Sequence, residues 1–101
     1  MRSSIDAVNQ WARERGIIPL ATPVYQFLKT VSEVGELGDS IAKLDRDGIK
    51  DGIGDVAVTL IILSSLYGWD FEDCLKHAYN QIKDRRGKTT IQGVFVKDSS
   101  V

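Results

Sequence analysis

The sequence predicts an all-α fold in a single domain, residues 1–101. Three observations support this. Apolar residues recur at helical spacing along residues 23–44, with charged residues on the other side. Helix start signals and glycine stops bound most of the apolar segments. The most apolar run, "IGDVAVTLIILSSLYGW", is too long for one strand and lacks internal turn residues, which favours a buried helix.

Each helix has a recognisable beginning or end. Ser3 or Ser4 can cap the first helix, and Gly16 stops it. Thr22 followed by Pro23 starts the second, after the interruption "IIPLATP". The tetrapeptide "DRDG", residues 45–48, reads as a turn, and Asp70 caps the last helix. We therefore expect a four-helix bundle, with helices at about 4–15, 23–44, 49–67 and 71–86 and a short extended C-terminal tail or hairpin.

Composition narrows the classes of function. Thirteen basic and fourteen acidic residues give a net charge of −1, which disfavours a nucleic-acid partner. Cys74 is the only cysteine, so no intrachain disulfide can form and a cytoplasmic location is the default expectation. The N-terminal segment lacks the apolar region of a signal peptide. Asp55, Thr59 and two serines interrupt the apolar run, so we expect no membrane partner.

Four carboxylates are spaced to share helix faces. Glu33 and Glu36 are three residues apart, and Asp51 and Asp55 are four apart. Two antiparallel helices joined by a short turn would bring the two pairs opposite each other. Facing carboxylates repel unless a cation neutralises them, and oxygen ligands favour Mg²⁺ or Mn²⁺.

The two carboxylate pairs differ in how strongly they indicate a metal site. A Glu-x-x-Glu pair alone is usually a solvated helix face. Asp55 is followed at once by Val56, Ala57 and Val58, so we expect its carboxylate to be partly buried and to need a partner or a metal.

A basic stripe on the last predicted helix complements the acids. Lys76, Asn80 and Lys83 share one face, flanked by Tyr79 and Arg86. Fixed cations beside a metal-binding cluster suit a polyphosphate. The alternative interpretation is a solvated basic helix end.

Four blocks together carry a family resemblance: "KTVSEVGELGDSI", "DGIGDVAVTLIIL", "YNQIKDRRGK" and "GVFVK". In order and spacing they resemble the MazG-like family of all-α nucleoside triphosphate pyrophosphohydrolases, especially its short phage- and cassette-encoded members, over about residues 20–97. The resemblance implies a MazG-like bundle assembled as a homodimer or homotetramer, with a site bordered by more than one subunit. It also implies Mg²⁺-dependent hydrolysis of (deoxy)nucleoside triphosphates to the monophosphate and pyrophosphate.

The resemblance also assigns roles to residues. Glu33 and Glu36 match the family's first acidic pair, and Asp55 matches the aspartate of its Glu-x-x-Asp pair; these three are the expected catalytic residues. Gly52 stands where the family has a glutamate, and we expect Asp51 to serve as the fourth metal ligand in its place.

Substrate contacts are expected from two parts of the chain. Lys83 and Arg86 match phosphate-side basic positions and Asn80 a polar position, while Lys29 and Gln26 lie one and two turns before Glu33. Base selection is expected from Trp11, Gln26 or Tyr79. Two other functions stay open: a non-catalytic helical oligomer that lost metal binding through Gly52, and a related phosphoribosyl-nucleotide pyrophosphohydrolase.

Overall fold

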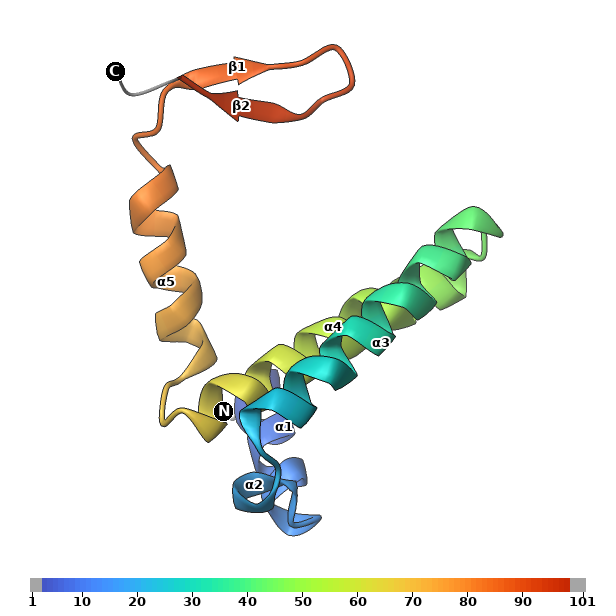
Figure 1. Cartoon of the computed structure of the whole chain (residues 1–101), viewed down its shortest axis with the longest axis vertical. Coiled ribbons are helices and arrows are strands. Elements are labelled where there is room, and N and C mark those ends of the chain that lie inside the picture. The colour runs from blue at the N-terminus through green and yellow to red at the C-terminus, as the bar shows by residue number, and fades with distance from the viewer. Residues whose placement is uncertain (1–2, 99–101) are drawn as a thin grey trace. The chain divides into compact units, whose positions relative to one another are not determined.

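The computed structural model describes residues 3–98, which form two compact units that divide between Phe71 and Glu72. The first unit holds four helices: α1 Ser4–Glu14, α2 Ile17–Leu20, α3 Pro23–Ala42 and α4 Arg46–Leu66. The second holds α5 Phe71–Ile82, which begins at the division, and the strands β1 Gly87–Thr89 and β2 Phe95–Lys97 (Figure 1). The predicted helical fold is confirmed, with one more helix than expected because α2 occupies part of the interruption before α3.

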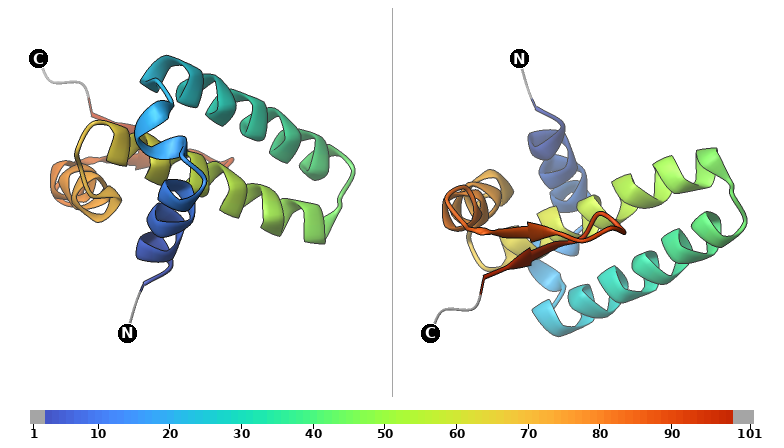
Figure 2. Two further views of the ribbon diagram at one scale, coloured as in Figure 1. Left: turned by 90° about the horizontal axis from the view of Figure 1, so that it is seen from below. Right: turned by 90° about the horizontal axis from the view of Figure 1, so that it is seen from above.

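The antiparallel pair α3–α4 is the most extensive helix contact of the first unit (Figure 2). α3 begins as predicted, because the Thr22 hydroxyl accepts a hydrogen bond from the Tyr25 amide and Pro23 occupies the first turn. The buried side chain of Gln26 then donates from Nε2 to the Thr59 carbonyl oxygen of α4, at 3.1 Å. This bond fixes the two helices at one level of the pair.

The connection between α3 and α4 is shorter than predicted. The Asp45 carboxylate accepts a hydrogen bond of 3.0 Å from the Gly48 amide, which makes Asp45 the N-cap of α4. α4 therefore begins at Arg46 and not near Ile49, and the "DRDG" turn prediction was wrong for its last three residues. Leu44, with φ of 56°, makes the turn between the helices.

One glycine in α4 allows a close approach between the paired helices. A Cβ on Gly52 would lie 2.9 Å from Leu37 Cδ1 and 3.2 Å from the Leu37 Cα of α3. Gly52 thus lies where the two helices approach each other closely. An added Cβ on Gly54, Gly35 or Gly38 would meet nothing within 4 Å.

α1 packs across α4 through a small polar and apolar face (Figure 2). Ser3 caps it by accepting from the Asp6 amide at 3.1 Å. Its buried residues are Asn9 and Ala12, and the Ser65 hydroxyl of α4 donates to Asn9 Oδ1 at 2.5 Å. Among the described residues the buried apolar core is small; it consists of Ala12, Ile61 and Ile62.

The second unit differs from the prediction at the end of its helix. α5 ends at Ile82 and not near Arg86, so Lys83 and Arg86 lie in the segment that leads into the hairpin. The strands pair antiparallel with Lys88 opposite Val96, which confirms the expected extended tail. All six strand residues are exposed.

No single helix within residues 3–98 has both the length and the hydropathy of a membrane span. α4 and α5 reach those limits only when they are counted together across the break between them.

Candidate active site

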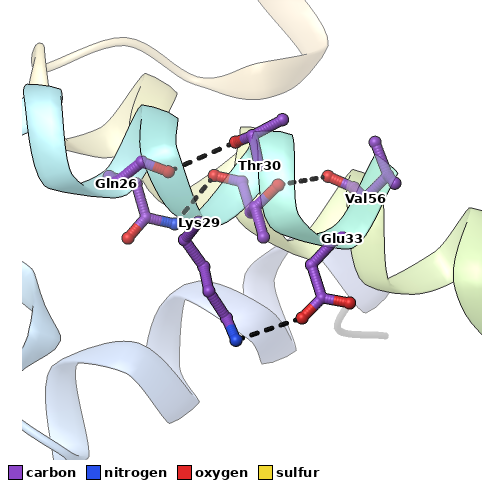
Figure 3. Close-up of polar contacts among 6 residues, drawn as sticks. Gln26, Lys29, Thr30, Glu33 and Val56 are labelled. Atoms are coloured by element: carbon purple, nitrogen blue, oxygen red, sulfur yellow. Dashed lines mark hydrogen bonds and ion pairs between the residues drawn. The ribbon is translucent and has the colours of Figure 1, made fainter. Parts of the chain in front are cut away.

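The first acid of the site is held by a lysine one helical turn before it. Lys29 Nζ lies 3.1 Å from Glu33 Oε1, and Figure 3 shows the two side chains reaching toward each other from one face of α3. The Glu33 side chain is only 12% exposed, whereas that of Lys29 is 61% exposed. The hydrogen bond from Lys29, helped by one with Glu36, holds the pKa of Glu33 below its ordinary value.

The second acid experiences the opposite effect. The hydrogen bond and the negative charge of Glu33 raise the pKa of Glu36 above its ordinary value, and the charge of Asp55 on α4 adds to this rise. The charges of Glu33 on α3 and of Asp55 on α4 thus both reach Glu36. Lys29 compensates only one of them directly, so the cluster has unneutralised negative charge.

Asp55 opens onto a hollow between α4 and α1. It is exposed, so the expectation of partial burial was wrong, although Val56, Ala57 and Val58 directly after it are partly buried. The hollow has a volume of about 440 Å³ and is lined by Asp55 and Val58 of α4 and by Ala7, Val8 and Trp11 of α1.

Trp11 is the aromatic residue in the lining of this hollow. The Arg15 guanidinium carbon lies 4.6 Å from the centroid of its ring, in a cation–π contact. Sequence reasoning named Trp11 for base selection but missed Arg15, whose i,i+4 spacing from Trp11 was the available signal.

The fit to a divalent cation rests on the donor chemistry. Glu33, Glu36 and Asp55 are all carboxylates, which are the ligands of hard cations, and the negative charges that act on Glu36 favour a positive partner. Within residues 3–98, no three His, Cys, Asp or Glu side chains converge closely enough to hold an ion as they stand. Asp51 is exposed, and the carboxylate that acts on Glu36 from α4 is that of Asp55.

The predicted substrate contacts fall into two groups. Gln26 is 6% exposed and its amide joins α3 to α4, so its observed role is structural. Asn80, Lys83 and Arg86 are exposed and belong to the second unit, and their approach to the acids stays a prediction.

Comparison with known proteins identifies the family of the chain. A family model described as "MazG nucleotide pyrophosphohydrolase domain" matches residues 23–90, which include α3, α4, α5 and β1. A protein of Haemophilus phage HP1 (strain HP1c1), described as "Uncharacterized 18.2 kDa protein in rep-hol intergenic region", is 41% identical over 64 residues. The match covers 63% of this chain and 39% of the phage protein. No solved structure matches the chain.

Proposed function

Because the chain belongs to the MazG nucleotide pyrophosphohydrolase domain family, we propose that it hydrolyses (deoxy)nucleoside triphosphates to the monophosphate and pyrophosphate. One observation carries the proposal. Glu33 on α3 and Asp55 on α4 both act on Glu36, and Asp55 opens onto the hollow that Trp11 lines.

The acids are suited to a divalent cation. Glu33, Glu36 and Asp55 would hold Mg²⁺, or Mn²⁺ in its place, with Asp51 assisting. The ion, when bound, neutralises phosphate charge and lowers the pKa of a coordinated water.

The chain's own residues supply proton transfer and orientation. Glu36, as a weakly coordinating carboxylate, takes the proton of the attacking water. Lys29 keeps Glu33 ionised and in place. The Trp11 ring, backed by Arg15, is positioned to stack against a base in the hollow.

Three residues of the second unit are proposed to contact the substrate. Lys83 and Arg86 bind the phosphates as fixed cations, and Asn80 contributes a neutral hydrogen bond. These three residues match the family positions expected to face the substrate. The reaction belongs to a reducing cytoplasm in this proposal, in keeping with the lone Cys74.

We further propose that the functional form is a homodimer or homotetramer. The outer face of α3 exposes a row of apolar side chains that no element of residues 3–71 covers: Val24, Phe27, Leu28, Val31, Val34 and Ile41, each more than half exposed. Gly35 and Gly38 leave room beside this row for another helix. An uncovered apolar face of this extent favours association.

Sedimentation velocity tests the association. Val31→Glu places a charge in the row and should shift the protein to a smaller species, while Lys43→Glu, at the exposed end of α3, should not. A wild-type protein that sediments as a monomer at all concentrations contradicts the assembly.

The enzymatic proposal is tested by pyrophosphate release from a panel of dNTPs and NTPs with and without Mg²⁺. Glu36→Gln and Asp55→Asn should each lower turnover by about 100-fold or more. Asp47→Asn, two turns before Asp55 on α4, is the matched control and should keep wild-type turnover. Full activity in both site variants would refute the site. If the protein turns over no triphosphate with Mg²⁺ or Mn²⁺, it is not the proposed enzyme. Turnover of a phosphoribosyl-linked nucleotide alone would favour the alternative function, a phosphoribosyl-nucleotide pyrophosphohydrolase.

A further inference from the structure

A second hollow opens on the other flank of α1. It has a volume of about 560 Å³, and four polar residues of α1 line it on one side. Their positions, 6, 9, 10 and 13, fall on one helix face at about 100° per residue. The opposite side is the end of α4 and the loop after it. The lining residues are Asp6, Asn9, Gln10, Arg13, Ser65, Gly68, Trp69 and Asp70.

This hollow is separate from the candidate active site. The α1 residues that face Asp55 are at positions 7, 8 and 11, on the opposite side of the helix from positions 6, 9, 10 and 13. Along α4, Ser65 lies ten residues after Asp55, which is about 15 Å at the helical rise. The two hollows share no lining residue.

Asn9 supplies a fixed recognition group. Its side chain is buried, with 9% of the residue exposed, and its Oδ1 accepts the Ser65 hydroxyl at 2.5 Å. The bond fixes which way the amide points, so its remaining hydrogen-bonding capacity is held in one orientation. Beside it, Gln10 donates through Nε2 to Glu14 at 2.9 Å, which leaves its carbonyl oxygen as an acceptor.

Trp69 supplies an aromatic surface. Its ring stacks on Tyr67 with centroids 5.3 Å apart and an interplanar angle of 19°. The residue is nevertheless 60% exposed. Tyr67 supports the indole, so part of the ring is available to stack on a planar ligand.

The charges of the lining select among planar ligands. The Asp6 carboxylate disfavours a phosphate group beside it, and the Arg13 guanidinium lies about two helical turns further along α1. Carboxylates are good acceptors for sugar hydroxyls, and side-chain amides pair with the edges of bases. We propose that this hollow binds an uncharged nucleoside, with the base on Trp69 and beside Asn9, and the sugar hydroxyls on Asp6.

Tryptophan fluorescence can locate the ligand, because the chain has two tryptophans. In Trp11→Phe only Trp69 emits, and titration with adenosine, guanosine, cytidine and uridine should quench it saturably for at least one of them. In Trp69→Phe only Trp11 emits, and the same nucleoside should leave its emission unchanged. Quenching of Trp11 with no quenching of Trp69 would place the nucleoside in the other hollow and overturn the proposal.

Equilibrium dialysis with the labelled nucleoside measures the contributions of the residues. Trp69→Leu should weaken binding by about 5- to 150-fold, the range that the loss of one stacked base corresponds to. Asp6→Asn should weaken it as well, whereas Asp47→Asn, an exposed acid on α4 outside the hollow, should not. Equal binding of the nucleoside 5′-monophosphate, or of ribose alone, contradicts the proposed chemistry.

The outcome is independent of the proposed activity. Asp55→Asn should lose turnover and still bind the nucleoside at Trp69. A chain that hydrolyses triphosphates but shows no saturable quenching of Trp69 refutes the nucleoside site alone.

Discussion

Gly52 is the position where one methyl group tests the helix pair most sharply. In Gly52→Ala the new Cβ would lie 2.9 Å from Leu37 Cδ1, 3.1 Å from Leu37 Cβ and 3.2 Å from Leu37 Cα. The leucine side chain can rotate, but its Cβ and Cα are fixed to α3. The two helices must therefore separate by a few tenths of an ångström.

The free energy of this change has two opposing parts. Overpacking of this kind costs about 1–3 kcal/mol. Alanine is better than glycine inside a helix by about 1 kcal/mol. The free energy of unfolding should thus fall by about 0–2 kcal/mol. Gly54→Ala, two residues later in the same helix, gains the helix propensity with no contact within 4 Å, so it should become more stable by about 0.5–1 kcal/mol.

Urea unfolding followed by far-UV circular dichroism, at one protein concentration for all variants, gives the comparison. The same chemical change should have a less favourable effect at position 52 than at position 54, by about 1–3 kcal/mol. If Gly52→Ala is as stabilising as Gly54→Ala, α3 and α4 do not approach as closely as described.

Three further predictions concern the helix pair and the acids. Gln26→Leu should lower the free energy of unfolding by about 1–3 kcal/mol in the same urea assay, because it leaves the Thr59 carbonyl without its partner; an unchanged midpoint would contradict the bond. Glu36→Gln should raise the melting temperature at neutral pH in a chelator. The pKa of Glu36 is raised in the folded chain, so its protonated form contributes to stability fully below pH 4.5, the ordinary pKa of the group. This contribution is lost as the pH rises through the pKa of the folded chain. The higher melting temperature of the variant should therefore vanish at acid pH. Mg²⁺ at one hundred times its Kd should stabilise the wild type by about 2.7 kcal/mol and Asp55→Asn by much less; equal shifts in calorimetry would exclude Asp55 as a ligand.

Local sequence signals predicted a helix correctly where capping residues and apolar periodicity determine its position. The Thr22–Pro23 start and the apolar periodicity of the following residues placed α3 correctly. "DRDG" misled because an aspartate followed by a glycine three residues later suits both a turn and an N-cap, and here Asp45 caps α4. The early end of α5 and the short helix α2 were not predicted, since neither is marked by periodicity over so few residues.

The sequence predicts which carboxylates the helix pair brings toward one another, but it does not predict which of them is covered by another helix. The spacing of Glu33 and Glu36 and the register of an antiparallel pair suffice to bring Asp55 toward them. Whether a side chain on α4 is covered depends on where α1 crosses α4. The spacing of the acidic residues in the sequence does not predict that position. Asp55 was therefore expected to be partly buried and is exposed. Gly52, in contrast, faces Leu37, so a glutamate at that position would meet α3 at once.

The most direct test of the central proposal identifies the products of one reaction. The wild-type protein is incubated with a dNTP and Mg²⁺, and phosphorus NMR follows the mixture beside a sample of Glu36→Gln. The account predicts the deoxynucleoside monophosphate and pyrophosphate in equal amounts with the wild type, and almost none with the variant. Formation of the diphosphate and inorganic phosphate, or no product at all, would contradict it.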